Sequence, residues 1–261
     1  MIAQIKNHLP EDHLWQDQII WYEVTDSTNN QAKILVQQGA PHGTVLIADQ
    51  QTCGRGRLGR SFQSLGGMGV YMSVILRLQV PVDQLMHLTC AAAVAACNAL
   101  EKAAGFRPGI KWTNDLVYGG RKLAGILTEL VIEKEETAVI VGIGINCTQK
   151  TADFSPDIQD FAGSLTMVSG ETIDRAKIAA ALIQAFSEMN ILDKQNILDT
   201  YRRDCITVGK QISLVKAEEV RHGYALGVDD NGALIVEFSD GHRETVNAGE
   251  VSIRGMYGYC P

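Results

Sequence analysis

The sequence lacks the cysteine patterns of a disulfide scaffold or a zinc site. It has six cysteines in 261 residues, and no two of them form a Cys-x-x-Cys pair. Small secreted domains that depend on disulfides are much shorter than this chain. His87 and Cys90 lie one helical turn apart, but no second pair has a matching spacing, so we expect no zinc site. This cysteine usage fits the reducing cytoplasm.

Long apolar runs and an excess of basic charge are also missing. The longest apolar run, 90–97, is far too short to cross a bilayer, and no signal-peptide pattern opens the chain, so we expect no membrane association. The formal net charge is -7 and the pI is about 5.4, whereas a general nucleic-acid-binding domain is basic. Only 23 residues precede Val24, which ends the first predicted strand. We therefore expect neither an N-terminal helix-turn-helix module nor a nucleic-acid partner.

The most distinctive feature present is segment 54–60, Gly-Arg-Gly-Arg-Leu-Gly-Arg. Glycines keep side-chain bulk off the backbone, so amide groups can approach a ligand while several guanidinium groups bind it. This composition predicts a loop that binds a carboxylate or phosphate. It is neither the phosphate loop of nucleotide hydrolases, which needs Gly-Lys-Ser/Thr, nor the dinucleotide fingerprint, which opens a helix. By itself the pattern also fits a flexible nucleic-acid-binding segment or a loop without function.

The stretch 54–69, called the arginine loop below, contains six glycines and is flanked by predicted strands. Its unbound conformations should be numerous, and ordering it costs about 1 kcal/mol or more per residue. We expect a loop that is mobile without ligand and closes when a ligand supplies compensating contacts.

Hydrophobic patterning predicts an α+β fold in which helices pack on a mixed, largely antiparallel sheet. The Gly119-Gly120 pair marks the turn of a hairpin. Residues 1–18 and 147–172 show no regular pattern. The expected strands are 19–24, 44–50, 69–78, 110–112, 115–118, 122–131 and 138–145, and the expected helices follow 26–29 up to Gly39 and span 83–104, 173–192 and 196–203.

The sequence changes character after Thr207, where short strands separated by turns begin. These strands are predicted at 211–216, 220–228, 233–238 and 242–246. They indicate a small β-barrel with too few residues for a large core of its own. We therefore expect two domains, 1–206 and 207–261.

Two sets of polar residues are candidates for a site. The first, Asp26-Ser27-Thr28-Asn29, either caps the following helix or faces a polar ligand, and different members can do each. The second, Lys111, Asp115 and Lys122, lies near hairpin ends. These three are either surface charges or, beside an arginine loop, a reaction centre.

At this point the residues resemble a known family, the biotin protein ligases, in the short form without an N-terminal DNA-binding domain. The matching segments occur in family order and cover most of the chain between about residues 20 and 254. They are 26–29, Gln50 with 54–60, 111–115, 121–127, 142–146 and 249–254.

The resemblance implies a catalytic domain of the class II synthetase type with an SH3-like C-terminal domain. It also implies that the carboxylate of biotin attacks the α-phosphate of ATP, with Mg²⁺, to give biotinyl-5'-AMP and pyrophosphate. A lysine of a biotin carboxyl carrier protein domain then attacks this mixed anhydride. Positive charge between the two anionic substrates lowers their repulsion.

The family pattern assigns roles to residues of this chain. The catalytic residues are Arg57, Asp115 and Lys122, with Asp115 orienting the carrier amine and accepting its proton. The biotin-binding residues are Ser27, Thr28, Asn29, Gln50, Arg55, Gly56, Arg57, Lys122 and Gly125. The ATP-binding residues are Arg55, Arg57, Lys111, Asn114, Lys122, Asn146 and Arg254.

Some alternatives stay open at the sequence level. Thr113 stands where the family usually has proline and Phe62 where tryptophan is usual, although neither change removes a reacting group. Asp115 also fits a turn residue, and Arg254 fits a structural ion pair. A lipoate ligase, a DNA-binding repressor and an inactive biotin binder are the competing functions, and both a monomer and a homodimer are possible.

Overall fold

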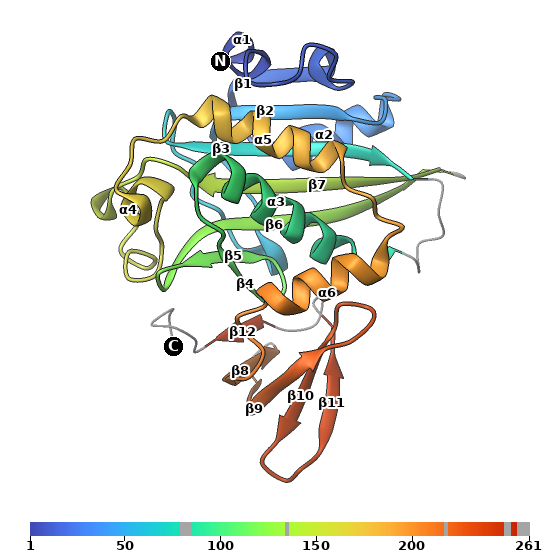
Figure 1. Ribbon diagram of the computed structural model, residues 1–261, viewed down its shortest axis with the longest axis vertical. Coiled ribbons are helices and arrows are strands. Elements are labelled where there is room, and N and C mark those ends of the chain that lie inside the picture. Colours follow the sequence, from blue (N-terminus) through green and yellow to red (C-terminus); the bar gives the residue numbers. More distant parts are fainter. Residues whose placement is uncertain (79–84, 134–135, 217–218, 248–251, 255–261) are drawn as a thin grey trace.

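The computed structural model describes residues 1–78, 85–133, 136–216, 219–247 and 252–254, the last three by their backbone (Figure 1). Its larger sheet has seven strands in the order β1-β2-β3-β7-β6-β5-β4. Strands β1 and β2 pair in parallel, and the remaining neighbours pair antiparallel. Their bounds are β1 Ile19–Thr25, β2 Thr44–Gln51, β3 Gly69–Arg77, β4 Gly109–Lys111, β5 Asp115–Tyr118, β6 Arg121–Glu133 and β7 Glu136–Asn146.

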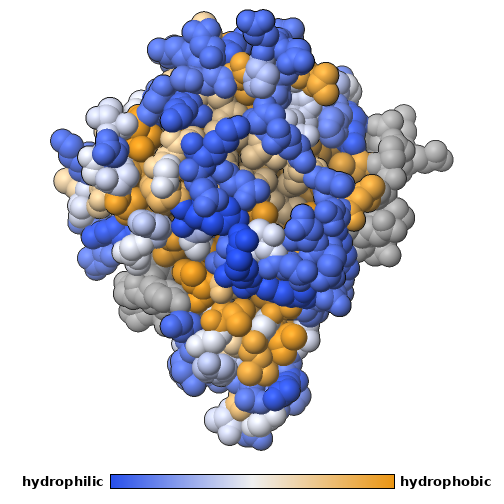
Figure 2. All heavy atoms as spheres, viewed as in Figure 1, coloured by the Kyte–Doolittle hydropathy of each residue, from blue (hydrophilic) through white to orange (hydrophobic). Residues whose placement is uncertain are grey.

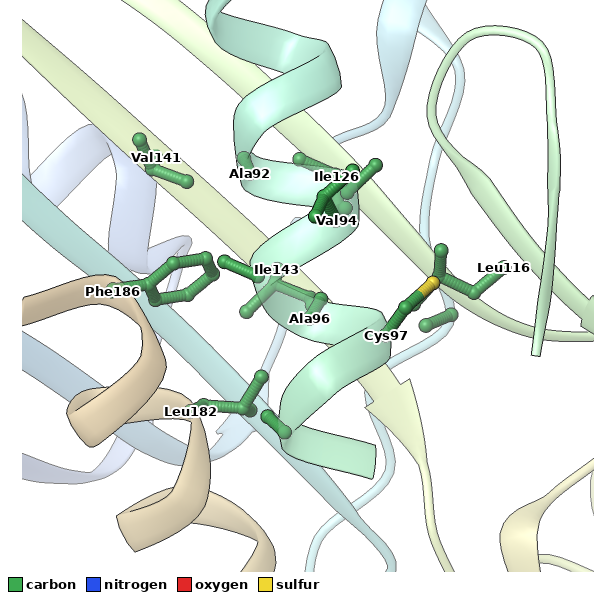
Figure 3. Close-up of a cluster of buried hydrophobic side chains, with 14 of the residues drawn as sticks. Ala92, Val94, Ala96, Cys97, Leu116, Ile126, Val141, Ile143, Leu182 and Phe186 are labelled. Atoms are coloured by element: carbon green, nitrogen blue, oxygen red, sulfur yellow. The ribbon is translucent and has the colours of Figure 1, made fainter. Parts of the chain in front are cut away.

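Helices cover both faces of this sheet. Helix α2 (Thr28–Gln37) packs on one face with Ala32 and Val36 against Leu46, Ile75 and Ile140. Helices α3 (Leu88–Ala104) and α5 (Arg175–Ser187) cover the other face, where small residues of α3 allow close approach to the strands (Figure 3). Strand β3 is therefore buried along almost its whole length.

Helix α6 (Lys194–Asp204) leads from the larger sheet to a second, five-stranded antiparallel sheet (Figure 1). The chain between them continues the larger sheet, because Ile206 N donates to Ile110 O of β4 at 2.9 Å. Figure 2 shows hydrophilic side chains over α5 and α6, which is the solvent-facing side of both helices. The second sheet has the order β11-β10-β9-β8-β12, with bounds β8 Gln211–Lys216, β9 Glu219–Val228, β10 Leu234–Phe238, β11 Arg243–Val246 and β12 Ser252–Arg254.

The α+β class and the largely antiparallel sheet predicted from sequence are confirmed, as is a small C-terminal antiparallel sheet. The hairpin at Gly119-Gly120 also forms, with positive φ at both glycines. The helix predicted at 83–104 begins at Leu88, and residues 83–84 of its predicted start lie outside the described residues. No helix in the described part of the chain is long and apolar enough to span a membrane.

Two short helices occur where the sequence showed no pattern. Helix α1 (Ile2–Lys6) is held by a fully buried Ile5, and α4 (Leu165–Ser169) by a buried Leu165 and a Ser164 side-chain cap. Helices of one turn are marginal alone and depend on such tertiary contacts. Their sequences are therefore too short to show a helical period.

Candidate active site

A pocket lies on the face of the larger sheet that α2 covers, beneath the arginine loop. Its floor includes Gly142 and Gly144, which share one face of β7 because side chains alternate along a strand. A Cβ at Gly142 would lie 2.0 Å from Asn29 Oδ1, and one at Gly144 would lie 2.5 Å from Phe62 Cε1. Glycine is therefore required at both positions for α2 and the arginine loop to approach the sheet.

One end of the pocket is formed where β1 passes into α2. Ser27 occupies the N-cap position, but its hydroxyl makes no capping hydrogen bond. Gln51 replaces it, because its Oε1 accepts from Thr28 N at 2.8 Å and lies 3.2 Å from Thr28 Oγ1. Its Nε2 donates to Ser64 Oγ of the arginine loop at 2.8 Å. Gln51 thus connects the helix N-terminus to the loop.

The structure places Gln51, and not the predicted Gln50, in the pocket. Gln50 is exposed and does not line the pocket, whereas Gln51 does. Neighbouring residues of a strand point to opposite faces, so only one of this pair can face a ligand on the α2 side. The alternation was the available signal, but both residues are polar, so hydrophobic patterning could not show which one points inward.

Asn29 and Arg55 belong to a network around Glu129 of β6. The Glu129 carboxylate accepts from Asn29 Nδ2 at 2.9 Å, from Lys33 Nζ at 2.8 Å and from Arg55 Nη1 at 3.1 Å. Burial alone would raise the pKa of Glu129, but the bonds from Lys33 and Asn29 outweigh it, and the pKa is lowered. Arg55 also donates to Asn30, so its charge is shared with groups at the pocket edge.

Arg57 lies deeper than Arg55. Its Nη1 donates to Thr113 Oγ1 at 3.1 Å and to Asn114 Oδ1 at 2.9 Å, which fixes the arginine loop against the segment that follows β4. Burial lowers the pKa of Arg57, although Asp115 opposes this shift. Because a guanidinium group stays charged in proteins, such burial favours an anion beside it.

Lys122 and Asp115 form an ion pair in the pocket, with 2.7 Å between Nζ and Oδ1. They sit on the antiparallel strands β6 and β5. Lys111 of β4 pairs in register with Asp115, lines the same pocket and is 4% exposed. Three cationic side chains, Arg57, Lys111 and Lys122, thus line the same pocket as this carboxylate. The geometry suits an anionic substrate and an acid–base step.

The backbone of Lys122 is held from a distant part of the chain. Lys122 N donates to Phe161 O at 2.7 Å, and Gly163 N donates to Lys122 O at 2.9 Å. The segment 147–172, which showed no sequence pattern, therefore supports a predicted catalytic residue.

Most of the sequence-predicted residues are brought together, with three exceptions. Gln50 faces away, and Asn146 does not line the pocket, because its amide donates to Gly163 O at 3.0 Å and its Oδ1 accepts from Gln149. Arg254 lies in β12, and its side chain falls outside the described residues. The predicted residues that do line the pocket are Ser27, Thr28, Asn29, Arg55, Gly56, Arg57, Lys111, Asn114, Asp115, Lys122 and Gly125.

No cluster of three or more His, Cys, Asp or Glu side chains that could hold a metal occurs in the described residues. Asp115 is a single carboxylate in the pocket, with the Asn114 amide beside it. Mg²⁺ commonly uses one or two carboxylates, with the remaining ligands from water and substrate phosphates. The donor set therefore fits an ion that arrives with a nucleotide, and does not fit a resident metal cage.

Comparisons with known proteins agree on one family. The Biotin/lipoate A/B protein ligase family matches residues 21–146, and the Biotin protein ligase C terminal domain matches residues 207–254. The bifunctional ligase/repressor BirA of Bacillus subtilis is 37% identical over 236 residues, covering 88% of this chain and 72% of that protein. The biotin–acetyl-CoA-carboxylase ligase of Mycobacterium tuberculosis is 33% identical over 238 residues, covering 87% and 85%.

A solved structure extends this similarity to three dimensions. The biotin protein ligase from Aquifex aeolicus in complex with biotin and ATP matches with a TM-score of 0.76 and 29% identity, covering 90% of this chain and 98% of that chain. The family match at 21–146 includes the pocket residues Arg57, Asp115 and Lys122. This chain belongs to the biotin protein ligase family.

Proposed function

We propose that this protein is an ATP-dependent biotin protein ligase that forms biotinyl-5'-AMP and transfers biotin to a lysine of a carrier domain. One observation carries the proposal: Arg57, Lys111 and Lys122 converge with Asp115 over a glycine floor, in the segments that match the family. We place the reaction in the cytoplasm, with the biotin carboxyl carrier protein domain of a carboxylase as partner.

Adenylate formation requires two anions to meet. Biotin lies on the floor beneath the arginine loop, with its ring system toward Ser27, Thr28 and Gln51 and its carboxylate toward Lys122. ATP lies toward Lys111 and Asn114. The cationic side chains stabilise charge that builds up at the α-phosphorus during attack, because they are fixed in place before the reaction. Phe62, which packs over Gly144, helps to exclude water from the product anhydride.

Mg²⁺ would arrive with the nucleotide, and the Asn114 side-chain oxygen would be the protein ligand available to it, because Asp115 serves the carrier amine. When bound, it neutralises phosphate charge. The cationic side chains of the chain itself then need to neutralise only the remaining charge.

Transfer to the carrier requires a neutral lysine amine, whose pKa is ordinarily about 10.4. The Asp115 carboxylate accepts a hydrogen bond from the incoming amine, orients it toward the acyl carbon and takes up its proton. Lys122 pairs with Asp115 before the reaction and holds that carboxylate in place in the pocket. AMP then leaves as the amide bond forms.

We also propose that the chain folds into two domains, the second of which contains the second sheet. We assign 1–206 to the catalytic domain and 207–261 to an SH3-like C-terminal domain. The second sheet begins at Gln211, and the C-terminal family match begins at residue 207, which supports this boundary.

The test measures adenylate formation and biotin transfer separately in the Asp115→Ala variant. Pyrophosphate exchange reports adenylate formation, and a mass spectrum of a carrier domain incubated with enzyme, biotin and Mg-ATP reports transfer. We expect exchange within about threefold of wild type and transfer slower by about 100-fold, the usual range for a lost general base. Equal losses in both half-reactions would contradict the role of Asp115, and a wild-type enzyme that modifies the carrier with lipoate and not biotin would contradict the proposed function.

A further inference from the structure

The turn between β9 and β10, residues 229–232, contacts the segment that follows β4 of the larger sheet, beside the pocket. Trp112 Nε1 donates to Gly232 O at 2.9 Å, and both residues are buried. Trp112 follows Lys111 at the end of β4 and lines the pocket itself. A turn from the second sheet therefore completes the surroundings of a pocket residue in the first.

The backbone around Trp112 is fixed from the same side. Trp112 N donates to Thr207 Oγ1 at 2.9 Å, and the buried hydroxyl of Tyr201 donates to Thr113 O at 2.9 Å. These groups belong to α6 and to the chain that leads into the second sheet. Since Lys111 and Asn114 flank Trp112 and Thr113, their positions depend on the same contacts.

Any other residue at position 232 would be strained and would crowd α3. The φ of Gly232 is +83°, a conformation that side chains disfavour, and a Cβ there would lie 2.8 Å from the buried Sγ of Cys90 in α3. The turn can therefore seat against α3 and Trp112 only with glycine. A larger residue would push it away from both.

Hydrogen bonds within the turn and from α6 fix its conformation. The Asp229 side chain accepts from Asn231 N at 2.8 Å and from Ala233 N at 2.9 Å. Arg202 of α6 donates to Val228 O at 2.8 Å and pairs with Asp230 at 2.7 Å. Arg202 thus clamps the turn from a site outside the pocket.

We infer that the 229–232 turn is a positioning element for adenylate formation, with Gly232 and Arg202 as positioning residues that act through Trp112. The turn fixes the Lys111–Asp115 segment so that its charged groups meet the substrates in the correct place. This inference rests on the proposed function and adds a role for the C-terminal sheet. A shift of about 1 Å in such groups can lower a rate by about 100-fold.

The inference predicts which kinetic constants change. Lys111 and Asn114 flank the 112–113 segment that the turn and α6 hold. Thr28 and Gln51, which we assign to biotin, belong instead to α2 and β2. Displacing the turn should lower the turnover number and raise the KM for ATP. The KM for biotin should stay within about twofold. A general loss of structure would change both KM values together.

The experiment compares Gly232→Ala with Gly241→Ala in the full chain. Gly241 also has positive φ, +79°, in the next hairpin of the same sheet, but a Cβ there meets nothing within 4 Å. Both variants place alanine in an unfavourable backbone conformation, and only Gly232→Ala disturbs the contact with Trp112 and Cys90. We expect pyrophosphate exchange to fall by about 10- to 100-fold in Gly232→Ala. In Gly241→Ala it should stay within about twofold, in line with a local backbone effect.

A second pair covers the case in which Gly232→Ala does not fold. Arg202→Met removes the clamp on the turn, and Arg243→Met removes an exposed ion pair with Glu237 elsewhere in the same sheet. Arg202→Met should lower the turnover number and raise the KM for ATP, but by less than Gly232→Ala. Arg243→Met should match wild type. Folded Gly232→Ala and Arg202→Met enzymes with wild-type exchange rates would overturn the inference.

Amide hydrogen exchange supplies a readout that does not need activity. Peptides covering 111–116 should exchange faster in Gly232→Ala than in Gly241→Ala. Equal exchange in the two variants would also overturn the inference. A different result would refute only the proposed function: wild-type protein forms no adenylate, but amide exchange in 111–116 is still faster in Gly232→Ala.

Discussion

Replacing Gln51 by alanine should damage both stability and biotin binding, whereas the same change at Gln50 should do neither. Gln51 Oε1 accepts from Thr28 N at the start of α2, and its Nε2 donates to Ser64. Losing an N-terminal cap costs about 1 kcal/mol, and losing the second hydrogen bond costs about 1 kcal/mol more. A total of about 2 kcal/mol corresponds to a fall in Tm of roughly 4–8 °C for a chain of this size.

The effect on ligand should accompany the effect on stability. Gln51 lines the pocket and fixes Thr28, so its loss should weaken biotin binding by about tenfold, which is about 1.4 kcal/mol. The measurements are thermal unfolding by circular dichroism and isothermal titration of biotin in the absence of ATP. Both would be made on wild type, Gln51→Ala and Gln50→Ala under identical conditions.

Gln50→Ala is the matched control, because it removes the same side chain from the adjacent, exposed position of β2. Its Tm should lie within about 1–2 °C of wild type, as for most surface substitutions. If Gln50→Ala weakens biotin binding as much as Gln51→Ala, the assignment of the inward-facing glutamine is refuted. Unchanged stability in Gln51→Ala would refute its capping role.

Two further predictions concern the arginine loop and acid stability. Arg57→Ala removes the bonds to Thr113 and Asn114, so the adenylate should escape; the fraction that stays bound after rapid gel filtration should fall several-fold, and full retention would contradict this role. Burial alone would raise the pKa of Asp26, but hydrogen bonds from Asn30 and Gln31 outweigh it and lower the pKa from 3.8 to about 2. A carboxyl group whose pKa is lower in the folded state than in the unfolded state stabilises the fold at any pH above its unfolded-state pKa. This stabilisation should therefore be lost as the pH falls from about 4 to about 2. Urea unfolding should show a smaller acid loss in Asp26→Asn than in wild type, and parallel pH profiles would contradict it.

Sequence alone determined the elements that depend on local pattern. Apolar patterning predicted the strands of the larger sheet and β8 to β11 of the second sheet, but not the short β12. Gly119-Gly120 predicted a hairpin because two adjacent residues with positive φ strongly favour glycine. Closely spaced glycines and arginines also marked the arginine loop as a candidate anion-binding segment, one of the uses that this composition allows. These features need only neighbours in the chain.

Tertiary structure decided which polar side chains face the substrates. The choice between Gln50 and Gln51, the pairing of Arg55 with Glu129 and the distance of Asn146 from the pocket all depend on segments far away in sequence. So does the contact of Trp112 with Gly232, residues separated by 120 positions. Such contacts arise only when separate elements pack together, because a polar residue at the end of a strand carries no local signal of the partner it will meet.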